Sequence, residues 1–187
     1  SARFEERYEN LLQELRAQNL LVIDLRSTLA KSGSFMVTDT HWSPQGAYRS
    51  ALVISDYATE NITSHSKFEL SQGPIKEFEG DLIAFAETGM WRAFAGPVLE
   101  TIQTFHIEPK ASENADDLGL FDDVIIPVAL VGTSFSARED FYFADFLKVA
   151  LQADLISYAL EGLGPFEPMR RFLQDKSISQ NPPQIVV

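Results

Sequence analysis

Asp39 and His41 stand two residues apart in the stretch T-D-T-H-W-S-P-Q-G, residues 38–46. In an extended segment, side chains two residues apart point to the same side, so both can reach one site. A carboxylate beside an imidazole can orient a general base, or the two can bind a metal ion. They can also form a polar turn in which Asp39 caps the backbone and His41 packs against Trp42. The pair alone leaves these three interpretations open.

A second reactive residue lies downstream, in the stretch V-G-T-S-F-S at residues 131–136. The apolar run over 123–131 predicts a central parallel strand, although Pro127 inside it is more typical of edges. Reacting groups gather at the carboxyl ends of such strands, where backbone N–H groups can stabilise an oxyanion. Ser134 is therefore a candidate nucleophile, with Ser136 as its rival, and we favour Ser134 because it lies closer to the strand end.

Composition excludes several classes of partner and site. Fifteen basic residues against 27 acidic ones give a net charge of −12, which repels nucleic acid and anionic membrane surfaces. Cysteine is absent, so thiolate metal sites are excluded. The other two histidines, His65 and His106, show no ligand spacing relative to His41. We therefore predict neither a metal nor another cofactor.

The elements that must position these residues are predicted from apolar spacing and from cap signals. Ser43-Pro44 is a helix start, because serine can cap a helix and proline suits its first turn. We expect helices over 3–18, 43–59, 140–151 and 167–176, and buried strands over 20–25, 123–131 and at Ile185. Helices that alternate with buried strands indicate an α/β layered domain.

The middle of the chain, at about 61–110, differs and predicts a β-rich insertion in that domain. Short alternating runs there suggest strands. Glycine and proline predict turns between them, at Gly73-Pro74, Gly80-Asp81, Gly89 and Gly96-Pro97. Residues 110–119 are expected to form an exposed acidic loop.

Several motifs in this order resemble one known family. They are D-x-H-W-S-P-x-G at 39–46, F-E-G-D-L at 78–82, P-V-A-L-V at 127–131, G-T-S-F-S at 132–136 and Y-A-L-E-G-L-G-P at 158–165. Together they resemble the SGNH-hydrolase-like domain of periplasmic polysaccharide O-acetyltransferases, of which the alginate O-acetylation proteins are the best known. The resemblance implies an SGNH-like, flavodoxin-like layered fold with a mainly parallel sheet.

The resemblance also assigns roles to the reactive residues. Ser134 matches the nucleophile of the family, His41 its general base, and Asp39 the carboxylate that orients the base. The order Asp, His, Ser is permuted relative to ordinary SGNH hydrolases. The implied function is an O-acetyltransferase that moves an acetyl group through an acetyl-serine to hydroxyls of an exported polysaccharide such as alginate. It implies a periplasmic location and an acetyl donor supplied by a membrane-bound acyltransferase partner.

Two other functions remain open on the same residues. One is a carbohydrate acetylesterase, and the other is a non-catalytic polysaccharide-binding module of a secretion complex. For a uronate polymer, Trp42 and Trp91 could stack on sugar rings, while Arg92 and Arg138 could offset the acidic field. We expect one catalytic domain over 1–187, shortened at its C-terminus, because the family continues past the last strand into a Trp-Glu and Arg segment.

Overall fold

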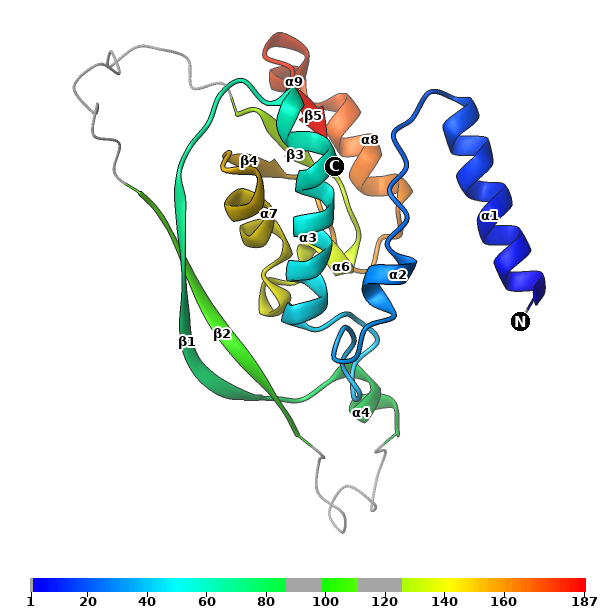
Figure 1. Ribbon diagram of the computed structural model, residues 1–187, viewed down its shortest axis with the longest axis vertical. Coiled ribbons are helices and arrows are strands. Elements are labelled where there is room, and N and C mark those ends of the chain that lie inside the picture. Colours follow the sequence, from blue (N-terminus) through cyan, green and yellow to red (C-terminus); the bar gives the residue numbers. More distant parts are fainter. Residues whose placement is uncertain (1, 87–98, 111–125) are drawn as a thin grey trace.

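The computed structural model describes residues 2–86, 99–110 and 126–187 and has an α/β fold, as predicted (Figure 1). A three-stranded parallel sheet lies at its centre in the order β4-β3-β5. Its strands are β3 (Val128–Leu130), β4 (Leu155–Ser157) and β5 (Ile185–Val186). The strand predicted at Ile185 is thus confirmed, and β3 leads directly into the serine turn.

The central strand is fully covered, and its position explains the proline. Val128, Ala129 and Leu130 are at most 1% exposed. Pro127 lies just before β3, so its missing N–H removes no bond from the ladder. Its carbonyl accepts the N–H groups of Gln184 and Ile185 instead. The first residues of the predicted strand, 123–125, lie outside the described part of the chain.

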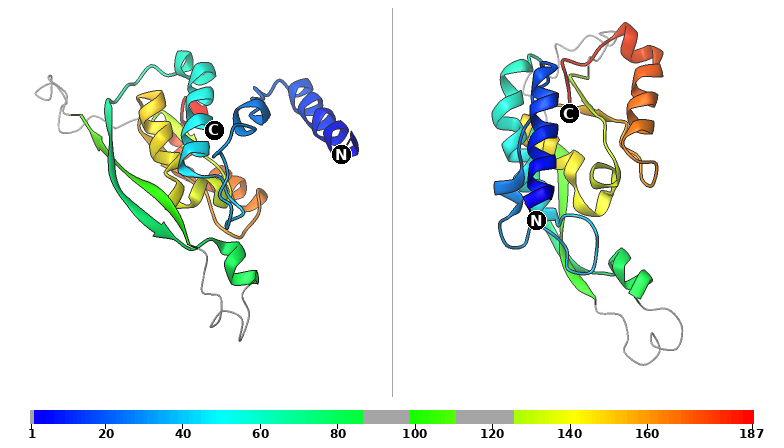
Figure 2. Two further views of the ribbon diagram at one scale, coloured as in Figure 1. Left: turned by 60° about the horizontal axis from the view of Figure 1, so that its bottom comes forward. Right: turned by 90° about the vertical axis from the view of Figure 1, so that its right-hand side faces the viewer.

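Helices cover the sheet on both sides. The long helix α3 (Pro44–Ala58) packs against α7 (Phe143–Leu151), and α3 and α8 (Phe166–Gln174) lie on opposite sides of the sheet (Figure 2). Among the described residues there are also the short helices α2 (Arg26–Leu29), α4 (Asp81–Ala86), α6 (Ser134–Ala137) and α9 (Lys176–Gln180), with 3-10 turns η1 (Thr59–Asn61) and η3 (Glu139–Phe141). The described ranges contain no helix that is both long and apolar enough to cross a membrane.

Helix α3 begins as the sequence predicts. Ser43 accepts a hydrogen bond from the N–H of Gly46, and Pro44 occupies the first turn. Its predicted apolar face is buried and consists of Ala47, Ala51, Ile54 and Ala58. The helix predicted over 167–176 is instead divided, because Asp175 is extended and caps α9 by accepting from the N–H of Ser177.

The strand predicted over 20–25 is wrong. This segment lies between α1 (Ala2–Ala17) and α2 and has no strand partner among the described residues. Leu20 and Leu21 are exposed, and Asp24 accepts local bonds from the backbone and side chain of Arg26. Such local bonds compete with a strand ladder. The helix predicted over 3–18 is confirmed as α1, which stands apart from the sheet (Figure 1).

Among the described residues, the predicted β-rich insertion contains a long antiparallel hairpin, β1 (Phe68–Phe78) and β2 (Glu100–Pro109), which lies beside α7 (Figure 1). The turn predicted at Gly73-Pro74 is wrong. These residues form a bulge inside β1, where the register shifts between Gln72 and Ile75, as suits a residue without an N–H. The turns predicted at Gly89 and Gly96-Pro97, and the loop over 111–119, lie outside the described residues.

Candidate active site

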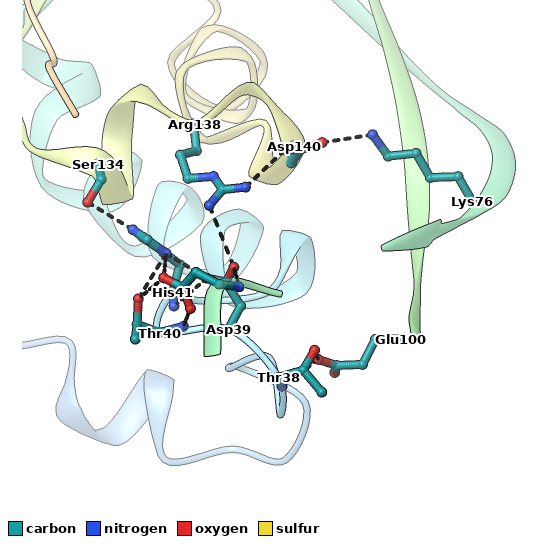
Figure 3. Close-up of polar contacts among 10 residues, drawn as sticks. Thr38, Asp39, Thr40, His41, Lys76, Glu100, Ser134, Arg138 and Asp140 are labelled. Carbon is teal, nitrogen blue, oxygen red and sulfur yellow. Dashed lines mark hydrogen bonds and ion pairs between the residues drawn. The ribbon is translucent and has the colours of Figure 1, made fainter. Parts of the chain in front are cut away.

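Asp39, His41 and Ser134 form one hydrogen-bonded relay (Figure 3). His41 Nδ1 lies 2.6 Å from Asp39 Oδ1, and His41 Nε2 lies 2.8 Å from Ser134 Oγ. An ionised carboxylate can only accept, so Nδ1 carries the proton and Nε2 accepts from the serine hydroxyl. The side chain of Asp39 is fully buried and that of His41 is 8% exposed. The structure thus brings together the three residues that the sequence proposed as catalytic.

Short-range bonds shape the loop that carries Asp39 and His41. Asp39 Oδ1 also accepts the backbone N–H of His41, a turn typical of aspartate. The backbone N–H of Met36 donates to the carbonyl of His41, and that of Ser43 donates to Ser34. These bonds close the loop ahead of α3 and fix the imidazole at the start of that helix.

Ser134 is presented by the tight turn that follows β3. Thr133 is extended at the N-terminus of α6, and its carbonyl accepts the N–H groups of Ser136 and Ala137. In the described part of the structure, the N–H groups of Ser134 and Phe135 are bonded to nothing else and are free to receive an oxyanion. A Cβ on Gly132 would lie 2.4 Å from Ser136 Oγ, so this position favours glycine.

The rival nucleophile faces another direction. Ser136 lines a cavity of about 520 Å³ that also includes Lys76, Arg138 and Asp140. The hydrogen bond to His41 Nε2 comes from Ser134. Because a serine needs an adjacent base to become nucleophilic, this contact favours Ser134 over Ser136.

Aromatic rings enclose the base. The His41 ring lies 4.8 Å from that of Phe135 and 5.6 Å from that of Phe141. Trp42 is only 7% exposed and packs against Phe135 and Phe143. Trp42 therefore exposes little of its indole for the stacking on sugar rings that the sequence suggested.

Arg138 points toward Asp39 and Asp140 of its own chain (Figure 3). Its guanidinium lies 3.6 Å from Asp39 Oδ2 and 3.3 Å from Asp140 Oδ2. Its Cζ also lies over the rings of Phe78 and Phe141, at 5.7 and 5.3 Å from their centroids. The guanidinium that the sequence suggested for a substrate carboxylate is thus paired with two carboxylates of its own chain. Trp91 and Arg92, the other two predicted binding residues, lie outside the described residues.

The surroundings of Asp39 keep it ionised. Burial acts to raise the pKa of Asp39, but hydrogen bonds from the backbone of Asp81 and from His41, together with the charge of Arg138, outweigh burial and lower that pKa. A carboxylate that stays charged at neutral pH can hold the imidazole in one tautomer and stabilise the imidazolium.

Sequence reasoning missed Asp81, the first residue of α4. Its backbone N–H donates to Asp39 Oδ2 at 3.0 Å, and its carboxylate accepts from the backbone N–H and the hydroxyl of Thr40. In the sequence, Asp81 indicates only a turn at Gly80-Asp81 and forms part of the motif F-E-G-D-L. A Gly-Asp pair at the end of a strand gives no sign of which loop it meets.

Asp39, His41 and Asp81 place their ligand atoms within 4.8 Å of one another, which is close enough for a metal ion. Each is already used by the chain itself, since Asp39 accepts from His41 and Asp81, while Asp81 accepts from Thr40. A cation would have to displace these bonds, so the three fit a hydrogen-bonded relay better than a metal site.

The chain is similar to known proteins that carry the name alginate O-acetylase. The chain is 35% identical to "Probable alginate O-acetylase AlgJ" of Pseudomonas aeruginosa over 96% of this chain and 49% of the relative, and 34% identical to the protein of that name in Azotobacter vinelandii over 98% and 49%. The chain thus spans about half the length of these relatives.

Solved structures show the same fold. The O-acetyltransferase domain of Pseudomonas putida AlgJ superimposes with a TM-score of 0.80 and 29% identity, covering 96% of this chain and 62% of that chain. AlgX of Pseudomonas aeruginosa superimposes with a TM-score of 0.76 and 24% identity over 97% and 43%, which supports the fold. The family model of the SGNH hydrolase-like domain of acetyltransferase AlgX matches all of residues 1–187. The chain therefore belongs to this family of SGNH hydrolase-like domains.

Proposed function

We propose that this chain is a serine-dependent O-acetyltransferase that moves an acetyl group to hydroxyls of an exported polysaccharide such as alginate. The observation that carries the proposal is the hydrogen-bonded relay from Asp39 through His41 to Ser134. A binding module has no use for a serine that is joined to a base and a buried carboxylate. The relatives named alginate O-acetylase support the acetyl group and the polymer as substrates.

In the first half of the reaction, His41 Nε2 takes the proton of the Ser134 hydroxyl. The serine oxygen attacks the acetyl carbonyl carbon, and the carbonyl oxygen becomes an oxyanion. The N–H groups of Ser134 and Phe135 donate to this oxygen. When the tetrahedral intermediate collapses, the donor's leaving group departs with the proton from Nε2. The acetyl group is then held on Ser134 as an ester.

In the second half, a sugar hydroxyl replaces the leaving group. His41 Nε2 takes the hydroxyl proton while the sugar oxygen attacks the ester, and the proton then returns to Ser134. Transfer wins over hydrolysis only where the acceptor is held near the ester and water is poorly placed. The same relay acting on water would make the chain a carbohydrate acetylesterase.

The cellular location of the reaction is inferred from its proposed substrate, an exported polysaccharide. An exported polysaccharide is modified outside the cytoplasm, so we propose a periplasmic location. We also propose that a membrane-bound acyltransferase partner supplies the acetyl donor. Within the chain, the proposal assigns residues 1–187 to one catalytic domain that carries an insertion at about 61–110.

The test is intact-protein mass spectrometry after incubation with 4-nitrophenyl acetate. Wild type should gain one acetyl group on Ser134. Ser134→Ala should gain none, while the matched control Ser136→Ala should behave as wild type. Adding alginate oligosaccharides should then yield acetylated sugar.

Three results would contradict the proposal in different ways. Ester turnover that only ever yields acetate, with oligosaccharide present, would identify an esterase. An acetyl group that persists in Ser134→Ala and is lost in Ser136→Ala would identify Ser136 as the nucleophile in place of Ser134. Oligosaccharide binding without any acetylation or turnover would identify a binding module.

A further inference from the structure

Asp81 holds the loop of the relay with both its backbone and its side chain. Its N–H donates to the carboxylate of Asp39, and its own carboxylate accepts from Thr40 N at 2.8 Å and from Thr40 Oγ1 at 2.5 Å. The next residue, Leu82, donates its N–H to the carbonyl of Thr38. Two short segments that are 42 residues apart in the chain are thus joined directly at the site.

The carboxylate of Asp81 also lies close to the base. Its Oδ2 is 3.7 Å from His41 Nδ1, beyond a hydrogen bond but well within electrostatic range. The hydrogen bond from Nδ1 goes to Asp39, at 2.6 Å. When His41 takes up the proton of Ser134, the resulting imidazolium therefore faces two carboxylates rather than one.

The hydroxyl of Thr40 lies between Asp81 and His41. Asp81 can only accept, so Thr40 Oγ1 donates its proton to Asp81. The oxygen lone pairs of the hydroxyl are then left toward His41 Nδ1, at 3.3 Å. Asp81 thereby orients a neutral acceptor, the hydroxyl oxygen, toward the same ring nitrogen.

The other groups around the base do not duplicate this effect. The rings of Phe135 and Phe141 carry no charge. Arg138 is the nearby cation, and it pairs with Asp39 and Asp140 rather than with Asp81. Arg138 offsets part of the negative charge of Asp39, and this makes the charge of Asp81 matter more for the imidazolium.

We propose that Asp81 is a positioning residue for the reaction at Ser134, which fixes Thr40 and, through its charge, favours the protonated His41 that forms during attack. This inference rests on the proposed function for its reaction. The effect of Asp81 on His41 can be measured without any acyl donor. The inference about Asp81 and the proposed function can therefore be tested separately.

The decisive variant is Asp81→Asn, which removes the charge and keeps the size and the backbone donor to Asp39. Thr40→Val removes the bridging hydroxyl and keeps the charge. Asp56→Asn, on an exposed position of α3, is the matched control for losing one negative charge. Asp39→Asn is the positive control, because it removes the direct partner of His41.

The first readout is the titration of the His41 ring followed by NMR. Removing a nearby negative charge disfavours the protonated ring, so the midpoint should move to lower pH. We expect such a shift in Asp81→Asn, a smaller one in Thr40→Val and none in Asp56→Asn, with the charge of Asp81 partly screened because its side chain is 28% exposed. A melting curve shows whether each variant is folded.

The second readout is the rate at which 4-nitrophenyl acetate acetylates Ser134. Asp81→Asn should lower kcat about fivefold with little change in KM, because the charge acts on the imidazolium in the transition state. A purely structural role would lower the melting temperature and leave the titration midpoint where it is.

Two results would overturn the inference. One is a midpoint for Asp81→Asn equal to that of Asp56→Asn while Asp39→Asn shifts clearly. The other is a shifted midpoint with an unchanged rate of acetylation. A wild type that is never acetylated would overturn the proposed function instead, and a midpoint unmoved in Asp39→Asn would show that the relay itself does not form in solution.

Discussion

Glu100 fixes the backbone that leads into the catalytic loop. From the start of β2, its carboxylate accepts the N–H groups of Val37 and Thr38 and the hydroxyl of Thr38 (Figure 3). Burial acts to raise the pKa of Glu100, but the hydrogen bonds from Thr38 and Val37 outweigh burial and lower that pKa. The residue next to Thr38 is Asp39, so the hairpin supports the relay through this one side chain.

Glu100→Gln should destabilise the protein and slow the acetylation of Ser134. A glutamine amide has one accepting oxygen, whereas the three donors need both carboxylate oxygens. We expect a loss of about 1 kcal/mol in the free energy of unfolding, measured by urea denaturation. Glu77→Gln makes the same change at an exposed position of β1 and should leave stability unchanged. Equal effects of the two variants would contradict the role of Glu100.

Single residues differ in how far the sequence reveals them. Asp39, His41 and Ser134 could be proposed as a catalytic set because their residue types suit one and the motifs around them resemble a known family. Glu100 and Asp81 could not, because their partners lie 62 and 42 residues away in the chain. For Arg138, the sequence shows a positive charge near the proposed site, and the folded chain adds that this charge is paired with Asp39 and Asp140.

At the scale of elements, the end of β1 docks against the catalytic loop through Gly80. A Cβ built on Gly80 would lie 1.9 Å from the carbonyl oxygen of Thr38 and 2.7 Å from the backbone N of Asp39. Both are backbone atoms, so they cannot move aside as a flexible side chain would. Only glycine allows the two segments to approach closely enough for the bonds between Asp81 and Asp39 to form.

Gly80→Ala should therefore separate these segments. We expect it to lower the free energy of unfolding by about 2–4 kcal/mol and to lower kcat for acetylation at temperatures where the protein is still folded. The control is Gly162→Ala, which has a φ of +71° and no atom within 4 Å of the added carbon. That change should cost only about 1 kcal/mol of backbone strain and leave kcat unchanged. A fully active Gly80→Ala would contradict this account.

Elements also differ in how well local sequence predicts them. Helix α3 follows from its own residues, because Ser43 and Pro44 begin it and its alanines line one face. The run over 20–25 has the composition of a buried strand. A strand forms, however, only where a neighbouring strand supplies the backbone hydrogen bonds. The glycine and proline in β1 have the same ambiguity, since a bulge and a turn use the same residues.

At the scale of the whole molecule, carboxylates dominate the charge, with 27 acidic residues against 15 basic ones. An excess of negative charge tends to raise the pKa of carboxylates, yet the folded structure lowers the pKa of several of them. Hydrogen bonds from Arg26 lower the pKa of Asp24 to about 2, and hydrogen bonds from Arg170 lower the pKa of Glu167 to about 2. The pKa of Asp140 is lowered as well, because hydrogen bonding to Lys76 outweighs its burial. The folded protein therefore binds fewer protons than the unfolded chain in mild acid.

This difference predicts the direction of acid unfolding. A carboxylate with a lowered pKa in the folded state stabilises that state above its ordinary pKa of about 4, and the stabilisation is lost as pH falls through the folded pKa. The melting temperature should therefore change little between pH 7 and about 5 and fall steeply between about 4 and 2. Asp145 opposes the trend, because burial raises its pKa, but it is outnumbered.

Circular dichroism melts at one-unit steps of pH test this, and two variants assign the effect. Glu100→Gln should flatten part of the fall, because it removes a partly buried carboxylate with several donors. Glu167→Gln should alter it little, because the exposed pair of Glu167 with Arg170 is screened by water. A melting temperature that stays constant down to pH 2 would contradict the predicted acid unfolding. A Glu167→Gln variant that flattens the fall more than Glu100→Gln would contradict the larger contribution expected of Glu100.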